Sequence, residues 1–215
     1  IGSGGREHAI AWALSKDPRV KKIYVAPGNG GTALETKVEN IPLTSFAELA
    51  DFASKRKVHL TVVGPEDPLS NGIVDFFAEK NLPIFGPTSG AAQLESSKEF
   101  AKSFMERHNI PTATYRIFSD ANLAHGFLSQ SKSNPIVIKA DGLAAGKGVV
   151  IARNSDEAHE AVDMLLVEKK FGSAGKKIVI EEFLKGREVS YIVAADGKSF
   201  VPLASSQDHK RLLEN

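Results

Sequence analysis

Several glycine-rich segments of this sequence have a basic residue inside them, a combination suited to binding anions. The clearest, at 141–148, reads Asp-Gly-Leu-Ala-Ala-Gly-Lys-Gly. Its small residues let backbone N–H groups approach a phosphate, and Lys147 adds a positive charge. It is not a Walker loop, because Gly148 stands where Ser or Thr should bind magnesium and an apolar strand follows. We expect a lid over a triphosphate; a hairpin tip without a ligand is the alternative.

Two further lysines lie where a bound anion would explain them. Lys139 interrupts the apolar run Ile136–Ala140, where burying an unpaired ammonium would be costly. Lys98 falls in the first turn of an expected helix, where the helix dipole disfavours a cation. A nearby phosphate would account for both positions. Lysines that extend to solvent are the alternative.

A second anion site is expected at Gly2-Ser3-Gly4-Gly5-Arg6-Glu7-His8, which leads into an amphipathic segment. The segment fails as a dinucleotide-binding fingerprint, because Glu7 replaces its third glycine. No acid stands about 20 residues later to hold a ribose. A phosphate on a small sugar, with Arg6 as charged donor, fits better. A tight turn without a ligand is the alternative, and His8 is expected to pack or to cap.

Two more loops, at 27–31 and 64–68, follow the next expected strands. The carboxyl ends of parallel strands meet at one edge of a sheet, where ligands bind. These loops and the first one are therefore expected to form one crevice. Glu66 could accept hydrogen bonds from ribose hydroxyls there, although a solvated turn acid would have the same sequence.

The segment 179–184 looks like a strand that runs into a linker. Such a segment can present backbone groups to adenine while a neighbouring acid holds the ribose. A plain strand end is the alternative. Further on, Ser206-Gln207-Asp208-His209-Lys210-Arg211 is a dense polar run, for which a solvated terminus would be a sufficient explanation.

The elements that position these loops fall into two patterns. Up to about residue 95, short strands alternate with amphipathic helices, which predicts a parallel sheet with crossover helices. In that part we expect strands at 23–26, 59–63 and 83–85, a turn at 65–68, and helices at 6–16, 46–53 and 70–80. After it, α+β structure with antiparallel pairing is expected, from helices at 96–108, 119–130 and 155–167 and strands at 136–140, 149–152, 177–182, 188–194 and 200–204. Capping boxes are expected at Ser45/Glu48 and Ser96/Glu99.

Composition excludes several classes of protein. The chain has 215 residues, a net charge of +1 and no cysteine. It therefore lacks a field of one sign for nucleic acid or membrane binding, and it lacks disulfides and thiolate metal sites. No apolar run approaches the roughly 20 residues that span a bilayer. We expect a soluble, cytoplasmic protein without nucleic-acid or membrane partners. Because the chain opens with Ile1-Gly2, without a methionine, we also expect it to be part of a longer protein.

An ordered set of motifs gives the sequence a resemblance to one family. The motifs are Gly-Ser-Gly-Gly-Arg-Glu-His, Ala-Pro-Gly-Asn, Val-Gly-Pro-Glu, Phe-Gly-Pro-Thr, Ala-Ala-Gln-Leu-Glu-Ser-Ser-Lys, Ile-Lys-Ala-Asp-Gly-Leu-Ala-Ala-Gly-Lys-Gly, Ile-Glu-Glu-Phe-Leu and Ser-Gln-Asp-His-Lys-Arg. In this order they resemble the glycinamide ribonucleotide synthetases, ligases of the ATP-grasp superfamily. The resemblance covers residues 1 to about 213.

The resemblance implies an α/β fold in two parts. A parallel-sheet pre-ATP-grasp domain that binds phosphoribosylamine would occupy residues 1–95. The first part of an α+β ATP-grasp domain would occupy 96–215, with a mobile lid at about 119–188. Magnesium ligands are expected beyond the end of this chain, so this part alone is expected to be inactive.

The implied reaction joins glycine to 5-phosphoribosylamine in purine synthesis, with ATP and Mg2+ as cofactors, through a glycyl phosphate. Catalysis would consist mainly of positioning and charge neutralisation. Phosphoribosylamine would contact Ser3, Gly4, Gly5, Arg6, Asn29 and Glu66. The ATP phosphates would contact Lys98, Lys139, Asp141, Gly142, Leu143, Ala144, Ala145, Gly146, Lys147 and Gly148. Adenosine would contact Glu181, Glu182, Phe183, Leu184 and Glu188, and the reacting groups would face Asp208, Lys210 and Arg211.

The sequence leaves three other functional hypotheses open. Another ATP-grasp carboxylate–amine ligase would carry a similar lid. A nicotinamide-dependent dehydrogenase is disfavoured by Glu7 and by the missing ribose acid. A noncatalytic nucleotide-binding fragment would share every local motif. The sequence gives no indication of the oligomeric state.

Overall fold

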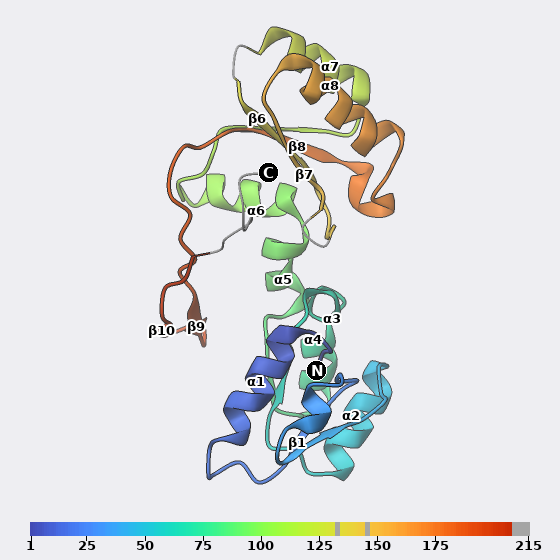
Figure 1. Ribbon diagram of the computed structural model, residues 1–215, viewed down its shortest axis with the longest axis vertical. Helices are drawn as coiled ribbons and strands as arrows, with labels where there is room; N and C mark the ends of the chain where they lie inside the picture. The colour runs from blue at the N-terminus through green and yellow to red at the C-terminus, as the bar shows by residue number, and fades with distance from the viewer. Residues whose placement is uncertain (132–133, 145–146, 208–215) are drawn as a thin grey trace. The chain divides into compact units, whose positions relative to one another are not determined.

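The computed structural model describes residues 1–131, 134–144 and 147–207, and it divides into two compact units (Figure 1). The first unit spans Ile1–Glu182 and the second spans Phe183–Asn215. The first unit contains two separate hydrophobic cores, one built from residues before position 85 and one from residues after position 117.

The beginning of the first unit contains two pairs of parallel strands; parallel pairing was predicted, whereas the strand at Val38–Asn40 was not. Strand β1 (Ile23–Val25) pairs with β2 (Val38–Asn40), and β3 (Thr61–Val62) pairs with β4 (Ile84–Phe85). Gly2 N donates to the carbonyl of Ala26, and Gly64 N donates to the carbonyl of Ile1. The extended start of the chain therefore joins both pairs at their carboxyl ends, the edge at which we expected ligands.

Away from that edge, the two strand pairs are separated. An apolar cavity of about 740 Å³ lies between β1 and β3 and is lined in part by Leu14, Tyr24, Phe52 and Val62. The sheet is thus continuous where Ile1 and Gly2 join it and open further from that edge.

Four helices surround these strands: α1 (Gly5–Ser15), α2 (Phe46–Lys55), α3 (Glu66–Ser70) and α4 (Ile73–Glu79). A short 3-10 turn, η1, spans Thr32–Leu34. The Ser45 cap is confirmed, since Ser45 Oγ accepts from the N–H of Glu48 at 3.3 Å. The turn expected at 65–68 is wrong, because those residues enter α3. Helix α4 begins at Ile73 rather than at 70, after Gly72 adopts a left-handed φ of +84°.

Two consecutive helices lead into the second core. Helix α5 (Ser89–Ser96), which the sequence pattern did not predict, is followed by α6 (Lys98–Arg107). The N-cap of α6 is Ser97, whose Oγ accepts from Phe100 N at 3.1 Å. The capping box expected at Ser96 is therefore wrong by one residue, because an adjacent serine offers the same hydroxyl and the chain places Ser96 inside α5.

A four-stranded sheet follows in the order β5-β8-β6-β7, with every neighbouring pair antiparallel. The strands are β5 (Tyr115–Phe118), β6 (Ile136–Ala140), β7 (Val149–Ala152) and β8 (Ile178–Glu182). The last three were predicted within one residue, whereas β5 was not predicted.

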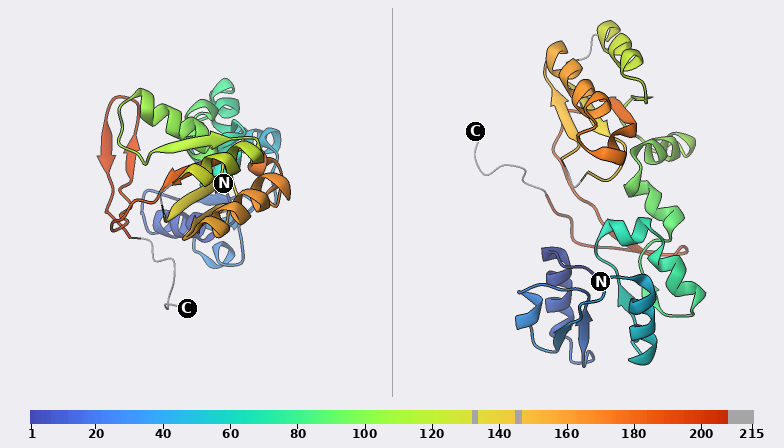
Figure 2. Two further views of the ribbon diagram at one scale, coloured as in Figure 1. Left: turned by 90° about the horizontal axis from the view of Figure 1, so that it is seen from above. Right: turned by 90° about the vertical axis from the view of Figure 1, so that its right-hand side faces the viewer.

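Helices α7 (Ala121–Gln130) and α8 (Ser155–Val162) cover one face of this sheet (Figures 1 and 2). Helix α8 continues as a π-helical turn at Asp163–Val167, and a 3-10 segment, η3, spans Gly172–Lys176. Ile138 of β6 and Ile180 of β8 point into the core beneath these helices. Because side chains alternate along a strand, the neighbouring positions of β6 and β8 face the other side of the sheet.

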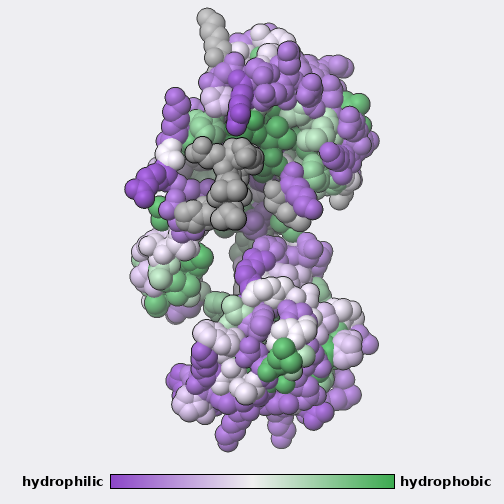
Figure 3. All heavy atoms as spheres, in the orientation of Figure 1, coloured by the Kyte–Doolittle hydropathy of each residue, from purple (hydrophilic) through white to green (hydrophobic). Residues whose placement is uncertain are grey.

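The second unit contains one antiparallel hairpin, formed by β9 (Val193–Ala195) and β10 (Phe200–Pro202). Its turn is the predicted one, with Asp196 Oδ1 accepting from Ser199 N at 2.7 Å and Gly197 in a left-handed conformation. Of the strand expected at 188–194, only the last two residues lie in a strand, β9. Hydrophobic side chains of the hairpin, among them Phe200, are exposed, and green and pale spheres mark it in Figure 3.

The position of the α6 cap gives a direct test. Replacing Ser97 by alanine removes the hydroxyl that accepts from Phe100 N, and it should lower the free energy of unfolding by about 1 kcal/mol. The change Ser96→Ala serves as the matched control and should have a much smaller effect. Urea unfolding of the unchanged protein and of the two variants measures both losses in free energy. Equal losses at the two serines would contradict the observed cap.

Candidate nucleotide and sugar-phosphate sites

A cluster of charged side chains lies on the sheet face opposite α7 and α8. Lys139 on β6 is paired across the ladder with Val179 of β8, which makes Glu181 its diagonal neighbour on the same face. The ammonium of Lys139 forms an ion pair with Glu181 Oε1. Lys139, on an apolar strand, thus has a carboxylate partner on the neighbouring strand β8, which was not predicted.

The third member of the cluster is Lys102, which sequence reasoning missed. Lys102 lies on α6 and is 8% exposed. Its Nζ is 2.5 Å from Glu181 Oε2, an ion pair rather than an aligned hydrogen bond. It also donates to Thr112 Oγ1 at 2.8 Å and to the carbonyl of Ala113 at 3.3 Å. Its spacing from Lys98 could have indicated that it lies near the candidate site, since residues four apart share one face of a helix.

Charge balance determines the protonation of Glu181. Burial alone would raise the pKa of this carboxyl, but the ion pairs with Lys102 and Lys139 outweigh burial and leave the pKa below its ordinary value. Glu181 is therefore a carboxylate shared between two ammonium groups, and the three side chains together carry one net positive charge.

Lys98 and Asp141 connect the start of α6 to the base of the glycine-rich segment. Asp141 Oδ1 accepts from Glu99 N at 2.7 Å and from Ser97 Oγ at 3.2 Å. Lys98 Nζ donates to the carbonyls of Asp141 and Gly142 at 3.3 and 3.2 Å. Burial lowers the pKa of Lys98. The carboxylate of Asp141 thus satisfies the helix start, and Lys98 lies against the backbone of the segment.

Two glycines of this segment are required by close packing. A Cβ on Gly142 would lie 2.9 Å from Ala174 Cα, and one on Gly148 would lie 2.7 Å from Ala144 Cβ. The N–H of Lys147 donates to the carbonyl of Ala144 at 2.9 Å. Leu143 and Ala144 are half-buried, whereas Ala145 and Gly146 lie outside the described residues.

The loops at the edge of the first sheet also converge. Arg6 donates to both carboxylate oxygens of Glu66, at 2.8 and 3.2 Å, and this hydrogen bonding lowers the pKa of Glu66. The Asn29 amide donates to the carbonyls of Ser3 at 2.8 Å and Gly4 at 3.4 Å. The structure therefore brings the candidate sugar-phosphate residues Ser3, Gly4, Gly5, Arg6, Asn29 and Glu66 to one edge.

Glu7 explains why the first loop departs from a dinucleotide-binding fingerprint. Its side chain is buried, and Oε2 accepts from Gly4 N at 2.7 Å. A Cβ on Gly2 would lie 2.3 Å from Glu7 Cγ, and one on Gly64 would lie 2.2 Å from Oε1. The carboxylate therefore fills the space beneath the loop, and two glycines make room for it.

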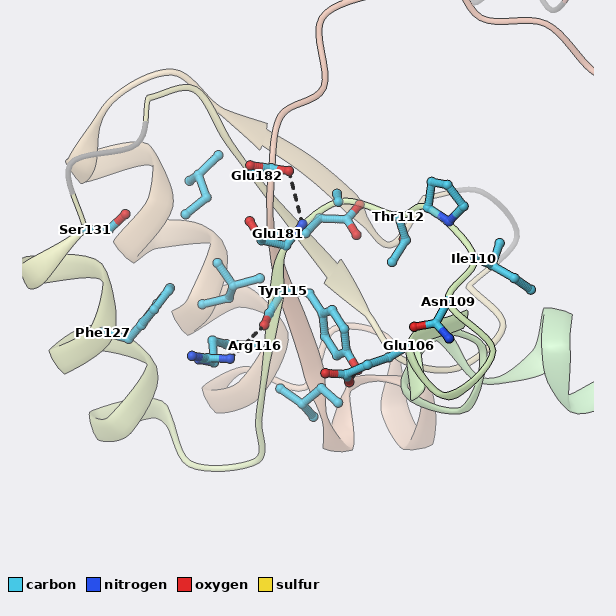
Figure 4. Close-up of a pocket in the computed structure, with 16 residues that line it drawn as sticks. Glu106, Asn109, Ile110, Thr112, Tyr115, Arg116, Phe127, Ser131, Glu181 and Glu182 are labelled. Atoms are coloured by element: carbon cyan, nitrogen blue, oxygen red, sulfur yellow. Dashed lines mark hydrogen bonds between the residues drawn. The ribbon is translucent and has the colours of Figure 1, made fainter. Parts of the chain in front are cut away.

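A hollow of about 830 Å³ lies along β5 and the end of β8 (Figure 4). In it, Tyr115 Oη donates to Glu106 Oε2 at 2.8 Å, and Glu182 Oε1 accepts from Thr114 N at 3.1 Å. Glu181 thus faces the lysines, and Glu182 ties β8 to the segment before β5.

The remaining candidate residues belong to the second unit or lie outside the described residues. Phe183, Leu184 and Glu188 belong to the second unit, where all three are exposed to solvent. Asp208, Lys210 and Arg211 lie outside the described residues. Within 1–131, 134–144 and 147–207, no group of three or more histidine and acidic side chains is arranged to hold a metal ion. In the same ranges, no helix has the length and apolar character needed to cross a bilayer.

Two family models match the chain. The N domain of phosphoribosylglycinamide synthetase matches residues 1–95, and the ATP-grasp (A) domain of the same enzyme matches residues 96–215. A phosphoribosylamine–glycine ligase of Ralstonia nicotianae is 60% identical over 214 residues, covering 100% of this chain and 50% of that protein. One from Neisseria meningitidis serogroup B is 58% identical over the same shares. The chain thus spans about half the length of these relatives.

Solved structures agree with this assignment. The phosphoribosylamine–glycine ligase of Thermotoga maritima superposes with a TM-score of 0.80 at 34% identity, over 98% of this chain and 50% of that one. An N5-carboxyaminoimidazole synthetase of Staphylococcus aureus complexed with ADP superposes with a TM-score of 0.71 at 16% identity, over 98% of this chain and 54% of that one, and shares the fold. The chain belongs to the phosphoribosylglycinamide synthetase family, with residues 1–95 matching its N domain and residues 96–215 matching its ATP-grasp domain.

Proposed function

We propose that the full-length protein joins glycine to 5-phosphoribosylamine in the cytoplasm, with conversion of ATP to ADP and phosphate. The relatives that cover this whole chain carry the name of this ligase. The observation that carries the proposal is a pair of candidate sites. One is a phosphate site formed by Lys98, Lys139 and the base of the 141–148 segment. The other is a sugar-phosphate site that contains Arg6 and Glu66. Residues 1–95 would form the sugar-phosphate domain, and 96–215 the beginning of the nucleotide-binding domain, with a lid at about 119–188.

The ATP phosphates would lie near Lys98 and Lys139. Lys98 Nζ is held by carbonyl oxygens rather than by a carboxylate, so an anion can gain its charge without breaking an ion pair. The N–H groups of the 141–148 segment would add donors that suit phosphate oxygens. The described residues offer no carboxylate set for Mg2+, so no step is assigned to the metal ion here.

Phosphoribosylamine would lie at the edge formed by the loops of the first sheet. The start of α1 provides free N–H groups for its phosphate, and Glu66 accepts hydrogen bonds that ribose hydroxyls could supply. Arg6 now pairs with Glu66, so the ligand would share or replace that contact. The acid and the cation therefore match a ligand with both hydroxyl and phosphate groups.

The reaction would proceed through a glycyl phosphate that the amine attacks. No covalent nucleophile from the protein is needed for this chemistry. The protein would contribute by holding the reactants in line and by stabilising the charge that develops on the transferred phosphoryl group. The candidates for contact with the reacting groups, Asp208, Lys210 and Arg211, remain predictions. The candidates for contact with adenosine also remain predictions: Glu181, Glu182, Phe183, Leu184 and Glu188.

A coupled assay of ADP release tests the proposed reaction. The full-length protein should release ADP at its full rate when ATP, glycine and phosphoribosylamine are all present. Omission of either glycine or phosphoribosylamine should reduce the rate at least tenfold. The chain of residues 1–215 should release none, because it lacks the second half of its relatives. A full-length protein that releases no glycine-dependent ADP would refute the proposal.

The sugar-phosphate site is tested separately through Glu66. The change Glu66→Gln keeps the shape of the side chain but removes the charge that accepts from Arg6 and from the ligand. It should raise the KM for phosphoribosylamine about tenfold, the size expected for one charged hydrogen bond, and should leave the KM for ATP unchanged. Glu79→Gln, at an exposed position of α4, is the matched control. An unchanged KM for phosphoribosylamine in the Glu66 variant would exclude this site.

A further inference from the structure

We propose that Lys102 is a positioning residue for the nucleotide: through Glu181, it keeps the charge of Lys139 available to the ATP phosphates. The inference rests on the proposed function and assigns a role to a residue that does not itself reach the ligand.

Lys102 cannot act on a ligand directly. Its ammonium donates to Thr112 Oγ1 and to the carbonyl of Ala113, and it forms an ion pair with Glu181 Oε2, so it is enclosed by groups of the protein. Its side chain is 10% exposed, compared with 29% for Lys139. Of the two lysines that share Glu181, Lys139 is therefore the one that is open to a ligand.

A buried ammonium is costly unless it has a partner of opposite charge and hydrogen-bond acceptors. Lys102 has both, and it is held from two directions: by α6, on which it lies, and by the Thr112–Ala113 segment before β5. Glu181 is held in turn by the β8 ladder, opposite Tyr115 on one side and Val137 on the other. Lys102 and Glu181 thus form a rigid pair beneath Lys139.

The proposed role of this pair follows from the net charge of the cluster with and without Lys102. With Lys102 present, the carboxylate of Glu181 is already balanced, and Lys139 contributes a net positive charge to its surroundings. Without Lys102, Glu181 would balance Lys139 instead, and the two side chains together would carry no net charge. An approaching phosphate would then have to separate Lys139 from its only strong partner in the cluster. Lys102 therefore balances the charge of Glu181, and the positive charge of Lys139 stays available to a phosphate.

The test uses the full-length protein and the change Lys102→Met, which keeps the apolar stem of the side chain. We expect the KM for ATP to rise about tenfold or more, the size expected from the loss of one charged contact. The changes in kcat and in the KM for phosphoribosylamine should be smaller. Lys102→Arg should recover at least part of the ATP affinity. Lys177→Met, which breaks the 2.5 Å ion pair between Lys177 and Glu99, is the matched control and should leave the KM for ATP unchanged.

The double variant Lys102→Met/Glu181→Gln separates positioning from packing. It removes the carboxylate that would otherwise neutralise Lys139, so its KM for ATP should be lower than that of Lys102→Met by about threefold or more. It also leaves no unpaired buried charge, so it should fold even if Lys102→Met alone does not. A double variant no better than Lys102→Met in ATP affinity would overturn the inference, as would a Lys102→Met variant whose KM for ATP stays within twofold of wild type. A wild-type protein without ATP-dependent ligation would instead refute the proposed function, and in that case equilibrium ATP binding of the same variants still decides the role of Lys102.

Discussion

The carboxylate of Glu181 makes the contacts on which the arrangement of α6 against the four-stranded sheet depends. Antiparallel pairing of β6 and β8 places Glu181 diagonally beside Lys139, and α6 brings Lys102 against the same carboxylate. The three groups come from three elements, so their contact fixes how the helix and the sheet meet on this face. A sheet interior that carries ionised groups is stable only when each of them has a partner. The fold therefore holds Lys139 in place without a ligand.

The start of α6 provides a second constraint, and it links that cluster to the glycine-rich segment. Asp141 satisfies N–H groups at the helix start, and Lys98 lies against the carbonyls of Asp141 and Gly142. The end of β6 that leads into the segment is thus tied to the start of α6. In the first sheet, Glu7 has a comparable role, because it is packed beneath Gly2 and Gly64 and shapes the loop that carries Arg6. Glu181 and Glu7 are thus both buried acids, and each lies close to a base that is more exposed, Lys139 and Arg6 respectively.

Much of this arrangement could be predicted from sequence, and what could not has a physical reason. Short apolar runs predicted β6, β7 and β8, and turn residues predicted the β9–β10 hairpin. Strand β5 was missed because Tyr115-Arg116-Ile117-Phe118 is short and follows polar residues closely. Lys139 was correctly recognised as anomalous, but its partner Glu181 lies on another strand, and pairing between strands is not visible along a single sequence. Lys102 was missed for the same reason, since its burial depends on the docking of α6 onto the sheet.

The most direct test of this account is a crystal structure of the full-length protein with a nonhydrolysable ATP analogue. The account predicts phosphate oxygens within hydrogen-bonding distance of Lys98 and Lys139, with the 141–148 segment against the phosphates and Glu181 still in contact with Lys102. An analogue bound elsewhere, with Lys139 and the 141–148 segment both free of ligand, would contradict it.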